Sequence, residues 1–319
     1  MRSAQKAAVL LIQLGTPDAL TRPSVARFIR LFLLDPKVIE LPAVLRKPLV
    51  SALIAPLRSG IALKRYRQIW DPETGSPLLH YTTALHQQLN DPSLGLPPVF
   101  AAFQYSSPSL EQQLEQIRIE GFNNLIIIPL YPQPAPSTTG SAISQTEKLL
   151  ARWPVRPTVR WITPLWDRPG YVDLLARQIT ACSPLNFDRI IFSYHGLPLK
   201  QARQGYSEAC SVMTEQLAGK LGLSTPRYVL AYQSRFGRGW TGPLTNQVID
   251  EVLTEGARSL LVVAPSFTAD CLETTWEIGI DFRKQFLDGG GERFEWVRSL
   301  NAEPGWVSWL AEVIRGIRE

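Results

Sequence analysis

The fold of this chain is decided by the stretch Asp188-Arg-Ile-Ile-Phe-Ser-Tyr-His195-Gly-Leu-Pro198. The apolar run from Ile190 to Tyr194 predicts a buried β-strand, and the glycine and proline that follow His195 end it abruptly. His195 therefore lies where a buried strand gives way to a loop. In open parallel α/β sheets this carboxyl edge is where ligands bind. The chain has three histidines, and only His195 has such a position.

The first half of the chain repeats this pattern. A predicted strand over 7–14 ends in Leu14-Gly-Thr-Pro, much as the later strand ends in His195-Gly-Leu-Pro. Three pairs of predicted strands correspond in order: 7–14 with 190–194, 99–104 with 229–233, and 124–129 with 260–264. Self-similarity of this kind predicts an α/β fold built from two related βα domains.

The composition is that of an ordinary globular protein, with 45% apolar and 19% charged residues among 319. The net charge of +5 is compatible with an anionic membrane surface, an acidic ligand or nucleic acid, but no nucleic-acid-binding motif accompanies it. The three cysteines are far apart and form no CxxC, so neither disulfides nor a cysteine-rich metal site are indicated. No run of about 18 apolar residues predicts a transmembrane helix. A cytoplasmic location is expected.

The first half also contains an insertion. Gly15 and Gln104 are 89 positions apart, whereas the corresponding Gly196 and Gln233 are 37 apart, which leaves 52 extra residues in the first half. They include the strongly apolar segment 41–57, which three prolines interrupt. A loop end of a strand is a common place for such an insertion to carry a lid or a docking surface.

Two interpretations of segment 41–57 stay open. It is either a helical segment packed in the core or an exposed apolar lip that rests on a membrane with basic residues at headgroup level. The length of the insertion favours the lip. The basic residues in and after the segment are Arg46, Lys47, Arg58, Lys64, Arg65 and Arg67.

An acidic segment follows the strand over 260–264. Asp270 and Glu273 fit a variant of the capping box at a helix start, which is a purely structural role. Glu273, Glu277 and Asp281 recur every four residues and so form an acidic ridge along one helix face. One explanation of this ridge is ordinary surface charge exposed to solvent. The other is that a cation passes along the ridge and offsets the repulsion between its carboxylates.

A histidine at one strand end and an acidic ridge beginning at another suggest a site for a divalent metal, because imidazole and carboxylate suit iron and zinc. Two ligands, His195 and Glu273, are fewer than a structural zinc site uses, so the ion is expected to be weakly held. A hydrogen-bonded structural histidine is the alternative.

Two further strand-end loops combine hydroxyls, glycines and basic groups, 233–243 and 137–140. Either loop could bind phosphate or carboxylate, although neither has a Walker or GxGxxG pattern. Trp240, between Gly239 and Gly242, could offer a flat apolar wall to an aromatic ligand.

Over essentially its whole length the chain resembles the ferrochelatases. The motifs that carry the resemblance are Leu14-Gly-Thr-Pro, Gly75-Ser-Pro-Leu, Tyr131-Pro-Gln with Ser-Thr-Thr-Gly140, Ser193-Tyr-His195-Gly-Leu-Pro, Gln233-Ser-Arg-Phe-Gly and Asp270-Cys-Leu-Glu273-Thr. The resemblance implies two Rossmann-like domains, each a parallel four-stranded sheet flanked by helices, with a porphyrin cleft between them. It implies insertion of Fe2+ into protoporphyrin IX to give protohaem with release of two protons.

The resemblance also implies roles for particular residues. His195 would accept a pyrrole proton and bind metal, Glu273 would be the opposing carboxylate, and Glu277 and Asp281 would form the metal route behind it. The porphyrin-binding residues that it implies are Leu14, Tyr105, Ser137, Thr138, Gln233, Ser234 and Trp240.

Some positions depart from the family pattern. Cys271 stands where relatives often have His, and the proline-rich loop 133–137 replaces a more polar stretch. Leu14 favours protoporphyrin IX, since the coproporphyrin-using branch tends to have Tyr there. A chelatase for another tetrapyrrole and metal, or a non-catalytic porphyrin or haem carrier, are the alternatives.

The expected domains are an N-terminal domain over 1–160 with the lip insertion at about 33–80, a C-terminal domain over 161–303, and a helix over 304–319 that packs back on the first domain. No permanently bound cofactor and no iron–sulfur cluster are expected, because Fe2+ is a substrate and the C-terminal cysteine cluster of some relatives is absent. A monomer with peripheral contact to the inner membrane face is expected.

Overall fold

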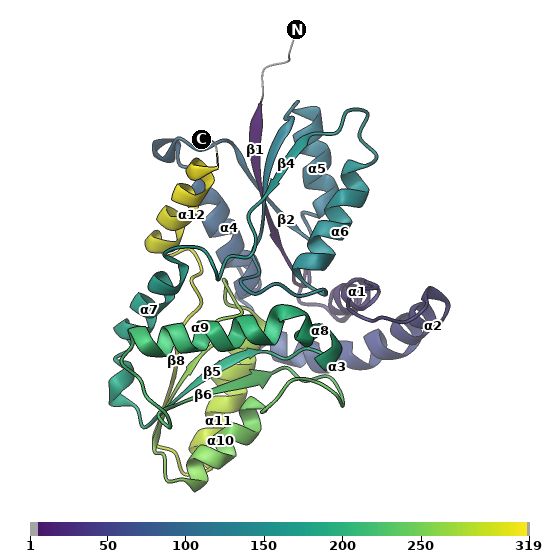
Figure 1. The fold of residues 1–319 in the computed structure, drawn as a ribbon. Helices are drawn as coiled ribbons and strands as arrows, with labels where there is room; N and C mark the ends of the chain where they lie inside the picture. The colour runs from purple at the N-terminus through teal and green to yellow at the C-terminus, as the bar shows by residue number, and fades with distance from the viewer. Residues whose placement is uncertain (1–5, 318–319) are drawn as a thin grey trace. The chain divides into compact units, whose positions relative to one another are not determined.

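The computed structural model describes residues 6–317 (Figure 1). Residues 1–5 and 318–319, at the outer ends of the first predicted domain and the predicted last helix, lie outside the described part. The chain forms two compact units. Within the described range, unit 1 comprises 6–131, 136–163 and 307–317, and unit 2 comprises 132–135 and 164–306.

Unit 1 is built on a four-stranded parallel sheet in the order β2-β1-β3-β4. Its strands are β1 (Ala7–Gln13), β2 (Val99–Phe103), β3 (Asn124–Pro129) and β4 (Thr158–Trp161). Leu10 and Leu11, on opposite faces of β1, are both fully buried. Helices therefore cover the sheet on both sides, which explains why its central strands are continuously apolar.

Helices cover both faces of this sheet, and other helices of unit 1 pack mainly on one another. The helices of unit 1 are α1 (Arg22–Leu33), α2 (Ala43–Pro48), η1 (Leu49–Ile54), α3 (Ala55–Tyr66), α4 (Pro77–Leu89), η2 (Pro92–Leu94), α5 (Leu110–Ile119) and α6 (Thr139–Leu150). Helices α5 and α6 pack with one face of β1, β2 and β3 in a single core. Helix α4 lies on the opposite side of the sheet (Figure 1).

Unit 2 repeats this topology, with a parallel sheet in the order β6-β5-β7-β8. Its strands are β5 (Arg189–His195), β6 (Tyr228–Gln233), β7 (Ser259–Val263) and β8 (Arg293–Trp296). The three predicted pairs of strands occupy equivalent places in the two sheets, so the internal repeat is confirmed.

The helices of unit 2 also cover both faces of the sheet. They are α7 (Tyr171–Ala181), η3 (Pro184–Asn186), α8 (Leu199–Gln201), η4 (Ala202–Tyr206), α9 (Ser207–Lys220), α10 (Thr245–Thr254), η5 (Leu272–Phe282) and α11 (Arg283–Asp288). Helices α10, η5 and α11 share a core with one face. Helices α7 and α9 lie on the other side (Figure 1).

The last helix, α12 (Pro304–Gly316), begins in unit 2, and its residues from Val307 onward belong to unit 1. Near the end of this helix, Nη2 of Arg315 donates to the carbonyl oxygen of Leu94 at 2.8 Å. Within residues 6–317, no helix combines the length and the apolar character needed to cross a bilayer.

Strands β4 and β8 are the two strands that sequence patterning missed. Each has only four residues and lies at a sheet edge, where half or more of its side chains are partly or fully exposed. Such strands carry no continuous apolar run, so the pattern that identified the central strands is absent from them.

Candidate functional site

His195 is the last residue of β5 and pairs with Gln233, the last residue of β6. The hydroxyl of Tyr206 donates to the carbonyl of His195 at 2.7 Å, and the His195 N–H donates to the Ser266 hydroxyl at 3.3 Å. Tyr206 and Ser266 also bond to each other at 3.0 Å. The backbone at the strand end is therefore held from two sides, by residues that sequence reasoning did not single out.

The imidazole of His195 has a defined orientation. Its Nδ1 lies 2.7 Å from the carbonyl oxygen of Gly196. Because a carbonyl oxygen can only accept, Nδ1 must carry the proton, and Nε2 of the neutral ring keeps a free electron pair. That nitrogen can take up a proton or bind a metal ion.

Gly196 is required by the close approach of two loops. A Cβ there would lie 2.7 Å from the carbonyl oxygen of Gln233 and 3.6 Å from the ring of Trp240. Trp240 forms a backbone bridge with Pro198 and stacks against Phe236, with 6.1 Å between ring centroids. The indole therefore lies directly beside the His195–Pro198 turn.

Gln233 connects the strand ends to the acidic helix η5. Its carbonyl Oε1 accepts from the Ser193 hydroxyl at 2.6 Å, and its Nε2 donates to the main-chain carbonyl of Glu273 at 2.8 Å. The next residue, Ser234, donates from its N–H to Oε1 of Glu277 at 2.9 Å and from its hydroxyl to Oε2. These contacts join the ends of β5 and β6 to Glu273 and Glu277.

The start of η5 differs from the prediction. The capping box consists of Cys271 and Thr274, not of Asp270 and Glu273. The Asp270 side chain is fully buried and accepts from the hydroxyl of Thr274 and from the guanidinium of Arg298. The structural interpretation of Glu273 as a cap is therefore wrong, because the first turn begins one residue later.

The predicted acidic ridge lies on a π-helix. The N–H of Arg283 bonds to the carbonyl of Ile278, five residues earlier, which is the wider turn of that helix type. Such turns occur frequently at functional sites. Glu277 and Asp281 line one cavity of about 440 Å³ together with the last residues of β6 and with Ser234, which follows it.

Glu277 is the carboxylate with the most perturbed environment in this cluster. Burial raises its pKa above the ordinary value of 4.5, and the negative charge of Glu273 acts in the same direction. The hydrogen bond from Ser234 and the charge of His195 oppose this increase. The charges of Glu273 and His195 are thus close enough to affect the ionisation of Glu277, so these three side chains form one electrostatic cluster.

The predicted site residues of unit 1 lie at the carboxyl edge of its own sheet. Leu14 follows β1, and its carbonyl accepts from the N–H of Tyr105 at 3.1 Å. Ser137 is buried, and Thr138 is the residue before α6. These four residues belong to unit 1, whereas His195, Trp240 and the residues of the acidic helix belong to unit 2.

The insertion contains an exposed apolar surface, so the interpretation of segment 41–57 as core is wrong. Val44 is 79% exposed and Leu57 is 67% exposed. We call this surface the lip. Its exposed apolar residues, on or beside α2, η1 and α3, are Leu41, Val44, Leu45, Leu53, Leu57 and Ile61.

Known proteins resemble this chain over nearly its whole length. A family model described as Ferrochelatase matches residues 6–317. A ferrochelatase of Klebsiella pneumoniae (strain 342) is 35% identical over 315 residues, which cover 97% of both chains. A ferrochelatase of Vibrio atlanticus (strain LGP32) is 35% identical over 319 residues, covering 98% of this chain and 99% of the relative.

Solved structures share the fold at low sequence identity. SirB from Bacillus subtilis with Fe3+ superposes with a TM-score of 0.58 at 10% identity, covering 97% of this chain and 94% of SirB. CbiX, described as the terminal enzyme of sirohaem biosynthesis in denitrifying bacteria, gives a TM-score of 0.50 at 14% identity and covers 98% of each chain. The predicted α/β fold of two similar chelatase-type sheets is confirmed.

Proposed function

This chain belongs to the ferrochelatase family and acts in haem biosynthesis by inserting a metal ion into a porphyrin, and we propose that the ion is Fe2+ and the porphyrin protoporphyrin IX. The two N–H protons of the porphyrin leave, its four nitrogens bind the iron, and the product is protohaem. The enzyme is then a lyase that forms nitrogen–metal bonds. The observation that carries the proposal is the arrangement of His195, whose hydrogen bond at Nδ1 leaves Nε2 unprotonated in the neutral ring, beside a cluster of carboxylates.

In this proposal His195 is the catalytic base. The bond from Nδ1 to the Gly196 carbonyl fixes the ring and leaves Nε2 to accept a pyrrole proton. The ring can then pass its proton to a carboxylate or to water.

Glu273 is the proposed partner of His195 in metal binding, and Glu277 and Asp281 form the proposed route. Carboxylates exchange readily with the water ligands of a divalent ion, so an ion could lose its hydration shell in steps along such a row. A raised pKa lets Glu277 take up protons that leave the site. No permanently bound cofactor and no iron–sulfur cluster enter this proposal, in which iron is solely a substrate.

Seven residues are proposed to contact the porphyrin. Trp240 offers a flat apolar surface next to the His195–Pro198 turn. Tyr105 is proposed to contribute its ring, since its hydroxyl is already hydrogen-bonded within the protein. The other five are Leu14, Ser137, Thr138, Gln233 and Ser234.

The test is anaerobic metal insertion. The protein is mixed with protoporphyrin IX and Fe2+, and the loss of porphyrin fluorescence is followed beside His195→Ala, with the exposed His80→Ala as a matched control. We expect rapid loss with the wild type and the control and almost none with His195→Ala. Shifted porphyrin fluorescence without insertion by the wild type would instead indicate a carrier. Faster insertion of cobalt into a sirohydrochlorin-like ring would indicate another chelatase.

We also propose that the lip rests on the cytoplasmic face of a membrane and that the protein works there as a monomer. Exposed leucines among lysines and arginines fit an anionic bilayer surface, and a poorly soluble porphyrin could enter and leave through it. The purified protein should bind anionic liposomes at low salt. If it ignores them, the membrane part of the proposal fails while the catalytic part stands.

A further inference from the structure

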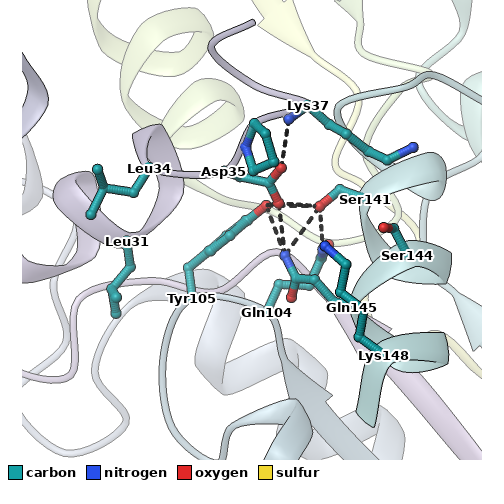
Figure 2. A pocket seen from close by; sticks show the side chains of 11 residues that line it. Leu31, Leu34, Asp35, Lys37, Gln104, Tyr105, Ser141, Ser144, Gln145 and Lys148 are labelled. Carbon is teal, nitrogen blue, oxygen red and sulfur yellow. Dashed lines mark hydrogen bonds between the residues drawn. The ribbon is translucent and has the colours of Figure 1, made fainter. Parts of the chain in front are cut away.

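A buried carboxylate in unit 1 lies outside the residues that the sequence indicated. Asp35, 8% exposed, follows α1 and accepts four hydrogen bonds. Its Oδ2 accepts from the hydroxyl of Tyr105 at 2.8 Å, from Nε2 of Gln145 at 2.8 Å and from the hydroxyl of Ser141, and its Oδ1 accepts from the N–H of Lys37 at 2.7 Å. Figure 2 shows these three side chains pointing toward the carboxylate.

The donors to Asp35 are neutral groups. The Lys37 side chain extends away from the carboxylate, and only its backbone N–H bonds to it (Figure 2). Burial alone would raise the pKa of Asp35, but the hydrogen bonds from Ser141, Lys37, Gln145 and Tyr105 outweigh it and hold the pKa below the ordinary 3.8. The group is therefore an anion at neutral pH, and it orients every hydroxyl and amide around it as a donor.

The hydrogen bonds extend beyond the carboxylate. Nε2 of Gln104 donates to the Ser141 hydroxyl at 3.2 Å, and the hydroxyl of Tyr131 donates to Oε1 of Gln104 at 2.5 Å. Tyr105 also meets the ring of Phe32 edge to face, with 5.4 Å between centroids. Both χ angles of Tyr105 are thus constrained, by the carboxylate at its tip and by Phe32 at its side.

These residues join three segments of unit 1. Asp35 comes six residues before Leu41, where the lip begins. Tyr105 follows β2. Ser141 lies in the first turn of α6, the helix that begins directly after Ser137 and Thr138. A cavity of about 300 Å³ opens between them, with Leu31, Leu34 and Lys148 also in its lining. The carboxylate of Asp35 thus connects the chain segment that leads into the lip with the two segments after β2 and β3 that are proposed to contact the porphyrin.

We propose that Asp35 is a positioning residue for porphyrin binding, which holds the Tyr105 ring and the start of α6 in the arrangement that receives the macrocycle. The inference rests on the proposed function, since it needs Tyr105, Ser137 and Thr138 to contact the porphyrin. Asp35 itself touches neither substrate. Its loss should weaken porphyrin binding and leave iron handling by the acidic helix of unit 2 unchanged.

The test compares Asp35→Asn with the wild type and with Asp91→Asn, an exposed carboxylate of unit 1 that caps the short η2 turn. Protoporphyrin IX binding is followed by fluorescence without metal, and KM is measured separately for porphyrin and Fe2+. We expect Asp35→Asn to raise both the porphyrin Kd and its KM by about tenfold at unchanged KM for Fe2+. Asp91→Asn should match the wild type in all three.

A double-mutant cycle tests whether Asp35 acts through Tyr105. Tyr105→Phe removes the hydroxyl, so the double variant Asp35→Asn/Tyr105→Phe should bind porphyrin little more weakly than Asp35→Asn alone. Additive losses would overturn the proposal, and so would equal increases in KM for both substrates. If Asp35→Asn does not fold, Tyr105→Phe and Ser141→Ala carry the same test, and porphyrin binding equal to the wild type in both would overturn it.

Failure of this inference is distinct from failure of the proposed function. If the wild type neither binds protoporphyrin nor inserts iron, the proposed function is wrong. If the wild type does both and a folded Asp35→Asn variant equals it, only the role of Asp35 is wrong.

Discussion

Ser234 binds the carboxylate of Glu277 at both oxygens, through its N–H at 2.9 Å and through its hydroxyl. It does so from a left-handed backbone conformation, with φ of +61°. A non-glycine residue rarely adopts this conformation, and such strain gathers at functional sites. The conformation aims the N–H and the hydroxyl of Ser234 at the same group.

Ser234→Ala should raise the KM for Fe2+ by about fivefold. The hydroxyl opposes the increase in the pKa of Glu277, so its loss leaves more of the carboxyl protonated and less able to bind a cation. Steady-state insertion kinetics with each substrate varied in turn measure the effect.

Ser234→Gly is the matched control for backbone strain. It also removes the hydroxyl, but it tolerates the left-handed conformation. If the hydroxyl is what matters, both variants behave alike. A normal KM for iron in Ser234→Gly would assign the effect of alanine to the backbone instead.

The double variant Glu277→Gln/Asp281→Asn should raise the KM for Fe2+ about tenfold or more while porphyrin affinity stays unchanged. Both side chains line the cavity beside Ser234, and neutral amides would attract the ion much less. Asp288→Asn, which removes an exposed carboxylate at the end of the following helix α11, is the control and should have no effect. An unchanged KM in the double variant would mean that iron reaches His195 by another route.

The positions of the central candidate residues were predictable from the sequence because these residues follow apolar strands that pattern analysis recognises. His195 and Gln233 each end such a strand, and Glu273 follows the third. Their helix was predicted as an ordinary one with Asp270 as its cap. Asp270 instead bonds to the distant Arg298, a contact that no local pattern encodes.

The Asp35 cluster could not be predicted in the same way. Its carboxylate lies 70 positions from Tyr105 and 106 from Ser141 in the chain. None of these residues belongs to a local sequence pattern that links it to the others. Only the parallel arrangement of β1, β2 and β3, which brings their carboxyl ends to one edge, makes them neighbours.

The π-helix η5 depends on a glycine beneath an indole ring. A Cβ on Gly279 would come within 2.9 Å of the Trp296 ring. Gly279→Ala should therefore destabilise the protein by about 1–3 kcal/mol, since the added methyl overpacks a buried contact. Urea denaturation measures the loss. Adding Trp296→Leu should recover part of it, because the shorter side chain makes room. If stability is not recovered, the loss in Gly279→Ala would come from the backbone at Gly279 and not from a clash with the indole.

If the lip binds the membrane, substitutions of its exposed leucines should selectively weaken membrane binding. Leu53→Gln/Leu57→Gln should lower the fraction of protein that sediments with anionic liposomes, because burying each leucine in the interface contributes about 1–2 kcal/mol. Ile119→Gln/Val155→Gln is the matched control, since these residues are just as exposed but lie outside the lip. Equal losses in the two pairs would mean that general surface hydrophobicity, and not the lip, drives the binding.

The last prediction concerns the pH dependence that Asp35 confers on stability. Its pKa is lower in the folded protein than the ordinary 3.8, so the folded state binds fewer protons there than the unfolded state. The stabilisation from Asp35 is thus fully present above about pH 4 and is lost as the pH falls through the lowered pKa. Asp35→Asn lacks this contribution, and at neutral pH it should be less stable by about 2 kcal/mol, since it leaves buried donors poorly paired. Urea denaturation of both proteins should give a difference that is constant from about pH 5 to pH 8 and shrinks below pH 4. A difference that grows as the pH falls would mean that the folded carboxyl takes up a proton more readily than the unfolded one, and that the four donors do not hold an anion.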